Sequence, residues 1–303
     1  MIRHIRHAEM DKAAWDLRHA ACMNATWYGC SAVLDAASPG WEALIDEEAG
    51  EQMPILWRRK YGIRYAYQPF MLQQSGPYSP APANADPLRF LQAWPKEFRF
   101  ADINIRWTAE RPALQGTTLT ERINHELRLD KPIEMLRAAY SENHRRSLRK
   151  AMKGTARFDD AITTPEVIAF LEGSEQFTKW KVGGPERDAM RRMMAVSDHA
   201  GTSIRRAVRE GDELVAAGYF TLWGGRLIFL KGLATPKGRD LRAMHALIDH
   251  VVEEHAGSNI ILDLAGGNDP QLARFYSGFG ALPVLYLRAL VNRLPPLLRQ
   301  LKQ

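Results

Sequence analysis

The sequence predicts an α/β (α+β) protein built from two domains in tandem, each with a mixed, mostly antiparallel sheet flanked by helices. Three observations predict this class. The chain has 303 residues, more than one domain usually contains. Its second half alternates apolar strand patterns with amphipathic helix patterns. Close to the C-terminus, an apolar strand ends in a glycine-rich break, after which a short helix and a last strand follow.

The composition is that of an ordinary soluble protein with a real core, since 46% of residues are hydrophobic and 25% are charged. The net charge of +6 is mild, so its distribution along the chain matters more than its total. Two cysteines, Cys22 and Cys30, form neither a disulfide scaffold nor a zinc site. The sequence shows no signal peptide and no apolar run of the ~20 residues that a bilayer span needs. We therefore expect a cytoplasmic protein without stable membrane insertion.

The first domain is predicted to cover residues 1–132. It should begin with a helix over residues 11–23 and contain a helix that starts at Asp86 and Pro87. Between and after these helices lie short segments that are bounded by glycine and proline or that alternate in polarity. These strand candidates are residues 41–45, 53–57, 65–69, 100–107 and 125–129.

The second domain is predicted to cover residues 133–303, beginning with a linking basic helix over 133–153. Its expected order is strand, two helices, three antiparallel strands, helix, strand, helix and strand. The helices are predicted at 165–179, 185–199, 239–255 and 269–278, and the strands at 203–209, 214–222, 226–234, 260–262 and 283–288. Gly224 and Gly225 form a two-residue link between apolar strands, which is typical of a hairpin.

The most basic segment of the chain runs from Arg137 to Arg157. After residue 143 it contains His144 and six arginine or lysine residues, and its single acid is Glu142. One interpretation is a solvated helix that docks through its few apolar residues. The other is a helix that faces phosphates or tRNA, because clustered arginine and lysine make sequence-independent phosphate contacts. No aromatic side chains interleave these charges, which argues against binding of single strands.

The C-terminal motifs resemble those of the GNAT superfamily of acyltransferases. They are Asp263-Leu-Ala-Gly-Gly267 and the run from Phe275 through Tyr-Ser-Gly-Phe-Gly to Ala281. The chain is most similar to the tandem-domain, FemAB-like branch. In that branch, a segment like Tyr140–Ala151 joins two such domains, and the first domain carries phrases like Lys60-Tyr-Gly-Ile63 and Tyr67-Gln-Pro-Phe70. The resemblance covers most of the chain, although its motifs are short.

This resemblance implies a co-substrate, acyl-CoA or acetyl-CoA, and no metal. In the superfamily, the carrier's pyrophosphate lies at the start of the helix after the fourth strand, where unpaired amides attract anions. Here that loop runs from Thr235 to Asp240, and an alternative interpretation is a plain capped turn. The residues that the resemblance assigns to cofactor binding are Thr235, Lys237, Gly238, Arg239, Leu233 and Asn268.

The resemblance also implies the catalytic groups. Tyr276 matches the family's general acid, which protonates the leaving thiolate, although an aromatic pair on a short helix can also be a core anchor. Backbone amides of residues 231–233 would hold the oxyanion. Asp263 is a candidate base, or an aspartate that bonds neighbouring amides. The branch often has an acid where this chain has Ala265, which puts a side-chain base at that position in doubt.

Three functions follow as hypotheses. The leading one is an N-acyltransferase that moves an acyl group from a thioester to a small-molecule or peptide amine acceptor. The second uses aminoacyl-tRNA as the donor, with the segment from Arg137 to Arg157 as the tRNA contact. The third is a catalytically inactive binding module, motivated by the off-pattern residues Ala265 and Asp240. Three histidines at positions 245, 250 and 255 recur every five residues, so they do not converge on one metal.

Overall fold

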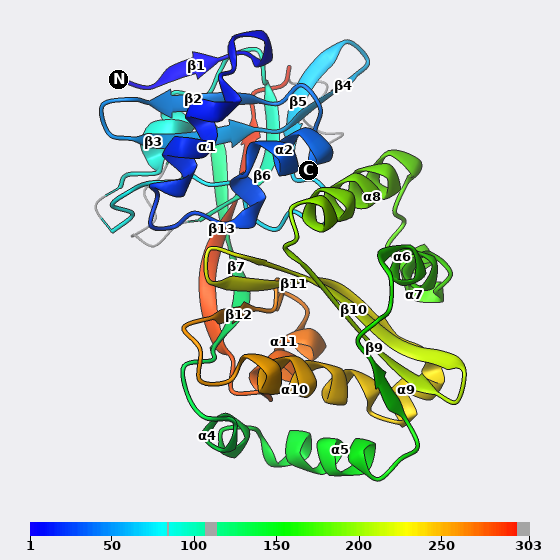
Figure 1. Ribbon diagram of the computed structural model, residues 1–303. Helices are drawn as coiled ribbons and strands as arrows, with labels where there is room; N and C mark the ends of the chain where they lie inside the picture. Colours follow the sequence, from blue (N-terminus) through cyan, green and yellow to red (C-terminus); the bar gives the residue numbers. More distant parts are fainter. Residues whose placement is uncertain (84, 107–113, 296–303) are drawn as a thin grey trace. The chain divides into compact units, whose positions relative to one another are not determined.

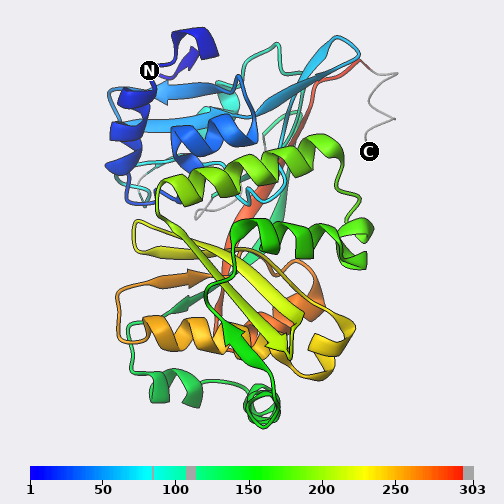
Figure 2. The same ribbon diagram turned by 45° about the vertical axis from the view of Figure 1, so that its right-hand side comes forward.

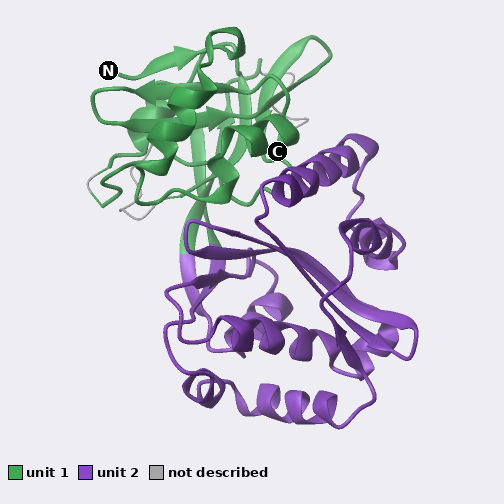
Figure 3. Cartoon of the chain, in the orientation of Figure 1, with its two compact units in different colours: residues 1–122, 285–303 green, residues 123–284 purple. Residues whose placement is uncertain are grey.

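The computed structural model describes residues 1–83, 85–106 and 114–295. These divide into two compact units, residues 1–122 with 285–303 (unit 1) and residues 123–284 (unit 2) (Figure 3). No helix in the described ranges combines the length and the apolar character that crossing a bilayer requires.

Unit 1 contains two sheets. The first has the order β1-β2-β3, and the second has the order β4-β5-β6-β13. Its elements are β1 (Arg3–Ile5), α1 (Lys12–Ala20), α2 (Ser31–Ala37), β2 (Glu42–Asp46), β3 (Glu51–Ile55), β4 (Trp57–Lys60), β5 (Ile63–Tyr67), α3 (Leu88–Gln92) and β6 (Phe100–Ile105), with short 3-10 turns at His7–Glu9 and Trp27–Gly29. Buried aromatic residues such as Phe90, Trp94 and Phe98 pack against these strands. The strand predicted over 100–107 is thus present to Ile105, and Trp107 lies outside the described residues.

Unit 2 begins within β7 (Thr117–Arg128) and ends within β13 (Leu282–Asn292). The elements between them are α4 (Ile133–Ala138), α5 (Glu142–Met152), β8 (Arg157–Asp159), α6 (Thr164–Glu172), α7 (Glu175–Lys179), α8 (Gly184–His199), β9 (Ser203–Glu210), β10 (Glu213–Trp223), β11 (Arg226–Ala234), α9 (Pro236–Asp240), α10 (Ala243–His255), β12 (Ile261–Asp263) and α11 (Pro270–Ser277). The predicted alternation of strands and helices is therefore confirmed.

The sheet of unit 2 has the order β7-β12-β11-β10-β9-β8. All neighbouring pairs in it are antiparallel except β11 with β12, which run parallel. Helices α6 and α8 lie over one face of these strands, and α10 lies over the other with α5 behind it (Figures 1 and 2). The core beneath α10 contains Leu247, Val251 and Phe220, all fully buried.

Two strands continue from one unit into the other. The end of β7 pairs with β12 inside unit 2, where Glu126 lies opposite Asp263. The end of β13 pairs with β6 inside unit 1, where Leu287 lies opposite Ile105. The predicted domains, 1–132 and 133–303, placed β7 wholly in the first domain and β13 wholly in the second. The compact units differ from that division because each is completed by a strand from the other half of the sequence.

Three helices predicted as continuous are broken. The predicted basic helix over 133–153 is α4 and α5, because the side chain of Ser141 accepts a hydrogen bond from the His144 N–H and starts a new helix. The helix predicted over 165–179 divides near Gly173 into α6 and α7. The helix predicted over 239–255 is interrupted by Arg242, whose φ of 61° lies in the left-handed region.

Candidate functional site

The loop after β11 is a self-contained helical turn. The Thr235 side chain accepts a hydrogen bond from the Gly238 N–H at 3.0 Å, which caps α9. A Cβ at Gly238 would lie 2.1 Å from the Val215 carbonyl oxygen, so glycine is needed there for packing against β10. Lys237 pairs with Glu213 at 2.7 Å. Thr235, Lys237 and Gly238, all predicted to bind the cofactor, therefore have contacts within the protein itself.

A second helix start follows seven residues later, at α10. No side chain caps it, and its N-cap residue is the exposed Arg242. Within the described ranges, the backbone N–H groups of Ala243 and Met244 have no hydrogen-bond acceptor. Free amides and the positive end of a 13-residue helix attract anions, and Arg242 adds a full charge.

A groove of about 390 Å³ lies beside this helix start. Arg239 and Arg242 supply its cations, and apolar side chains of α10 and α11 form part of its walls. Its lining residues are Gln176, Gly232, Leu233, Ala234, Gly238, Arg239, Arg242, Met244, His245, Leu272 and Phe275. A cationic part joined to an apolar part suits a ligand with a phosphorylated end and an uncharged arm.

A second cavity of about 620 Å³ lies on the other side of the end of β11. Helices α6 and α7 form its far wall, and Lys179 and Arg239 supply its cations. The two cavities share four residues, Gln176, Leu233, Ala234 and Arg239. The last residues of β11 are therefore accessible from both cavities.

The strands β11 and β12 separate next to the groove. Only three residue pairs join them, the last being Ile228 with Asp263, and β11 then continues to Ala234. The register of β11 against β10 shifts so that Tyr219 faces Lys231 and Phe220 faces Phe229, which leaves Leu230 as a bulge. The backbone of residues 231–233, predicted to hold an oxyanion, thus lies beyond the end of β12.

The side chain of Lys231 lies with its Nζ 4.1 Å from the centre of the Trp180 ring. Burial lowers the pKa of this lysine to about 8. A cation so placed is attracted to the ring and has lost part of its water shell. Lys231 lies next to the lining residue Gly232.

Tyr276 lies on α11, which Asp269 caps by accepting hydrogen bonds from the Gln271 and Leu272 N–H groups. The tyrosine is only 5% exposed and its ring is 6.0 Å from that of His125. Burial, aided by nearby Asp263, raises its pKa well above the ordinary value, so the phenol is protonated at neutral pH. Its neighbour Phe275 lines the groove, whereas Tyr276 packs in the core beside it.

Asp263 is buried at the end of β12 and is fully engaged. It accepts hydrogen bonds from Asn124 at 2.8 Å and from the Ala265 N–H at 2.9 Å, and it pairs with Arg226 at 2.9 Å. Burial raises its pKa, and Arg226 opposes that rise. These contacts match the interpretation of Asp263 as an anchor for neighbouring amides.

The glycine-rich loop after Asp263 is attached to β7. Asn124 accepts a hydrogen bond from the Gly266 N–H at 3.0 Å, and the predicted cofactor residue Asn268 accepts one from the Ile123 N–H at 3.0 Å. Ala265, at the position where the family often has an acid, has a φ of 48°, in the left-handed region that favours glycine. The loop is thus held in a strained conformation directly beside Tyr276.

Several groove residues were not identified by the sequence. Met244, Leu272 and Phe275 belong to apolar helix patterns that are equally typical of core. His245 carries no metal signal, yet it lines the groove with its ring 4.7 Å from that of His144. Burial, together with His144 and Arg242, lowers the pKa of His245 to about 4, so it is neutral at neutral pH.

His144 fixes the basic helix α5 against α11. Its Nε2 donates to the Phe275 carbonyl oxygen at 2.8 Å, and its Nδ1 lies 3.0 Å from the Ser141 hydroxyl. On the opposite face of α5, the cations at 145, 146, 149, 150 and 153 are all exposed. Arg137, in contrast, pairs with Asp249 at 2.7 Å and Glu253 at 2.9 Å, so it is not part of that free charge.

Among the residues that the structure describes, two clusters have the residue types of a metal site, and an arginine pairs with each. Arg206 lies 3.3 Å from Asp160 and 2.9 Å from Glu254 in the cluster with His250. In the cluster of His4, Glu42 and Glu97, Arg64 pairs with Glu42. Both clusters are therefore explained as ion-pair networks.

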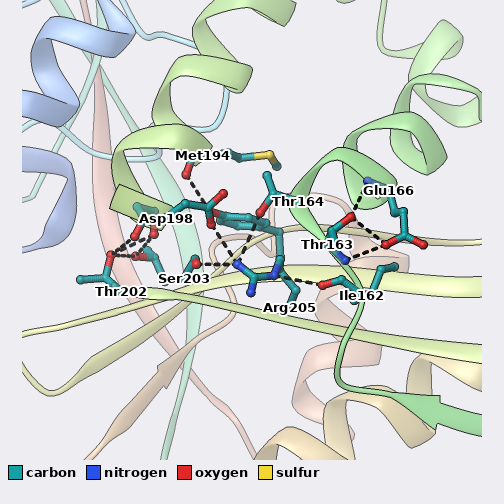
Figure 4. A network of polar contacts seen from close by, with 12 residues as sticks. Ile162, Thr163, Thr164, Glu166, Met194, Asp198, Thr202, Ser203 and Arg205 are labelled. Carbon is teal, nitrogen blue, oxygen red and sulfur yellow. Dashed lines mark hydrogen bonds and ion pairs between the residues drawn. The ribbon is translucent and has the colours of Figure 1, made fainter. Parts of the chain in front are cut away.

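A polar network fixes the helices over the other face of the sheet. Arg205 donates to the Ile162 carbonyl oxygen at 3.1 Å and pairs with Asp198 at 2.9 Å, as Figure 4 shows. The Tyr219 hydroxyl donates to the Met194 carbonyl oxygen at 2.9 Å. These bonds tie α6 and α8 to β9 and β10, and α6 and the following α7 form the wall of the larger cavity.

Comparisons with protein-family models and with curated proteins found no match. Solved structures do match. FemX has a TM-score of 0.66 at 11% identity, covering 99% of this chain and 100% of its own. A conserved protein of unknown function from Bacteroides thetaiotaomicron gives 0.58 at 12% identity, covering 96% and 99%. A tandem GNAT protein from the clavulanic acid biosynthesis pathway gives 0.55 at 10% identity, covering 96% and 98%.

These similarities extend over nearly the whole chain, and identities this low carry information about the fold. β11, β12 and α11 follow one another in the order that the sequence predicted, whereas the helix start at Arg242 was not predicted. The chain therefore has a fold like that of FemX and of the tandem GNAT protein.

Proposed function

We propose that the protein is an N-acyltransferase that takes its acyl group from coenzyme A thioesters and transfers it to an amine. The observation that carries this proposal is the groove beside α10. Its cationic part suits a pyrophosphate, and its apolar walls at Met244, Leu272 and Phe275 suit the uncharged arm of the carrier. The groove reaches Gly232 and Leu233, where β11 has separated from β12.

The reaction follows from these positions. The amine nitrogen attacks the thioester carbonyl carbon, and the oxygen that gains charge is held by backbone N–H groups of residues 231–233. The carbon–sulfur bond then breaks as the carbon–nitrogen bond is completed. Tyr276 is the proposed donor of a proton to the leaving thiolate. It packs in the core next to the groove-lining Phe275, so its hydroxyl must reach the groove in the complex for this step, and its raised pKa leaves the phenol protonated at neutral pH. The amine loses its extra proton to water, because Asp263 is fully occupied by protein donors.

Calorimetric titration with coenzyme A and with acetyl and longer acyl thioesters tests the binding step. We expect saturable binding that the double variant Arg239→Ala, Arg242→Ala weakens at least tenfold, because charge-assisted phosphate contacts are lost. Lys237→Ala is the matched control, since it removes a nearby cation that pairs with Glu213 and does not line the groove. Absence of binding for every thioester would contradict the proposal.

The chemical step is tested with Tyr276→Phe. If Tyr276 is the general acid, the rate of transfer should fall roughly 10²-fold while thioester affinity stays the same. A catalytically inactive binding module would bind thioesters and show no transfer in either protein. This experiment therefore separates the enzyme from the binding module.

A second candidate function uses aminoacyl-tRNA as the donor, and the exposed face of α5 favours it. Its five cations follow one helical stripe, and no ion-pair partner lies beside Arg146, Arg149, Lys150 or Lys153 among the described residues. Such a stripe suits a phosphate backbone. The triple variant Arg145→Ala, Arg146→Ala, Arg149→Ala should weaken salt-dependent tRNA binding. Binding that is absent, or insensitive to salt, would exclude this candidate.

A further inference from the structure

The β4–β5 hairpin of unit 1 has a composition unlike the rest of the chain. Residues 57–67 read Trp-Arg-Arg-Lys-Tyr-Gly-Ile-Arg-Tyr-Ala-Tyr, with four cations, four aromatic residues and no acid. Among the described strands, β4 is the edge strand of its sheet and pairs with β5 alone. The hairpin therefore combines positive charge and aromatic rings at a sheet edge. The helix α5 has exposed cations without aromatic side chains among them.

The turn of the hairpin is short and places an aromatic ring at its tip. Tyr61 and Gly62 have φ values of 51° and 76°, as the two central residues of a type I′ turn require. Tyr61 is 91% exposed. A two-residue turn of this type holds the strands in tight register, so the tip is a fixed feature of the hairpin.

The register assigns the other side chains to two faces. Arg58 lies directly opposite Tyr65, and Lys60 lies opposite Ile63, so these residues share one face with Tyr67. Tyr65 and Tyr67 are partly exposed, with ring centres 6.2 Å apart, and the Arg58 guanidinium lies 4.2 Å from the Tyr67 ring centre. This face is a row of rings and cations.

The other face is anchored to the unit. Arg64 lies 3.9 Å from the Trp57 ring centre and 4.5 Å from that of Phe98, and it pairs with Glu42. Arg59 and Lys60, near the tip, are exposed and have no ion-pair partner among the described residues. The hairpin is thus fixed at its base and carries its uncompensated charge at its tip.

We infer that the β4–β5 hairpin binds single-stranded nucleic acid that passes over its tip. Lys60 and Tyr65 contact it from one face of the hairpin, Arg59 from the other and Tyr61 from the turn, with the two cations on phosphates and the two tyrosines stacking on bases. Phosphate contacts by cations combined with base stacking on aromatic side chains define this mode of binding. An anionic lipid surface fits less well, because only Tyr61 offers a fully exposed apolar group for insertion. This surface consists of unit 1 residues, shares none with the groove and does not depend on the acyl donor.

The test uses a fluorescently labelled 12-nucleotide single-stranded RNA and the full-length protein, with binding followed by anisotropy at several salt concentrations. The double variant Arg59→Glu, Lys60→Glu should weaken binding roughly tenfold and reduce the salt slope by about 1.4, since each phosphate contact contributes about 0.7. Tyr61→Ser should weaken binding about fivefold or more with the salt slope unchanged, because a stacking contact is lost. All three substitutions are at exposed positions near the turn, so the fold should persist.

The control is the double variant Lys96→Glu, Lys131→Glu, which makes the same charge change at exposed lysines outside the hairpin. It should bind the RNA nearly as well as the original protein. The inference is overturned if the control and the hairpin variant lose equal affinity, or if the protein binds anionic vesicles and not RNA. Coenzyme A binding should be identical in all these variants, so failure here is distinct from failure of the proposed reaction.

Discussion

The two helix starts that follow β11 differ in whether their amides are already used. At α9, the Thr235 side chain occupies the Gly238 N–H, and Gly238 itself is packed against Val215. At α10, no side chain caps the helix, and Arg242 stands beside the open amides of Ala243 and Met244. A helix start can bind an external anion only with amides that the protein has not already paired. The open start belongs to the longer helix and borders the groove.

The largest change in stability is expected at the start of α9, the closed start, whose Gly238 amide is already paired with Thr235. Gly238→Ala should lower the free energy of unfolding by about 3 kcal/mol, because its Cβ would lie far too close to the Val215 carbonyl oxygen and β10 would have to move. Urea denaturation measures this. The matched control is Gly184→Ala, whose Cβ would meet nothing within 4 Å. If both variants were equally stable, Gly238 would be free for a role in binding.

The next effect concerns pH at the open start. His245 has a pKa of about 4 in the folded protein, below the value of about 6.5 expected in the unfolded chain. The unfolded chain therefore binds more protons between pH 6.5 and 4, and stability should fall as the pH is lowered through this window. We expect His245 to contribute about 2 kcal/mol to this loss. The contribution of His245 is the difference between the original protein and His245→Gln in the free energy of unfolding, measured as a function of pH. If the two pH profiles were parallel, the lowered pKa of His245 would be contradicted.

The sequence predicted the elements of unit 2 well because their periodicity is local. β11 was predicted at 226–234 and lies at Arg226–Ala234, since a continuous apolar run and the Gly224-Gly225 link define a hairpin without tertiary information. The pairing of the end of β7 inside unit 2 and of the end of β13 inside unit 1 could not be predicted in this way. Strand pairing is a long-range choice, and the apolar pattern of a strand does not say which sheet it joins.

The sequence placed the phosphate contact at the start of α9, on the strength of Gly238, whereas we propose it at the start of α10. The predicted residues Leu233, Gly238 and Arg239 line the groove. The break at Arg242 gave no signal, because arginine rarely adopts a left-handed conformation and the helix pattern continues through it. Phe275 and Tyr276 are adjacent in the sequence, and only packing decides that the first faces the groove and the second the core.

Arg242 allows charge and conformation to be separated. Arg242→Gly should raise the free energy of unfolding by about 0.5–1 kcal/mol, because glycine adopts a φ of 61° without strain. The same change should weaken coenzyme A binding about tenfold, because a cation beside the open amides is lost. We therefore expect Arg242→Gly to be more stable than the original protein and to bind coenzyme A more weakly. Unchanged affinity would place the anion elsewhere in the groove.

The last prediction concerns the side-chain cap of α9 at Thr235. Thr235→Ala should lower the free energy of unfolding by about 1 kcal/mol, since the Gly238 N–H loses its acceptor. Thr235→Ser keeps the hydroxyl and is the control. Coenzyme A affinity should be the same in both, because the ligand's phosphates use the amides of α10. If Thr235→Ala bound coenzyme A more tightly, the freed Gly238 amide would be serving the phosphate, and the distinction between the two helix starts would fail.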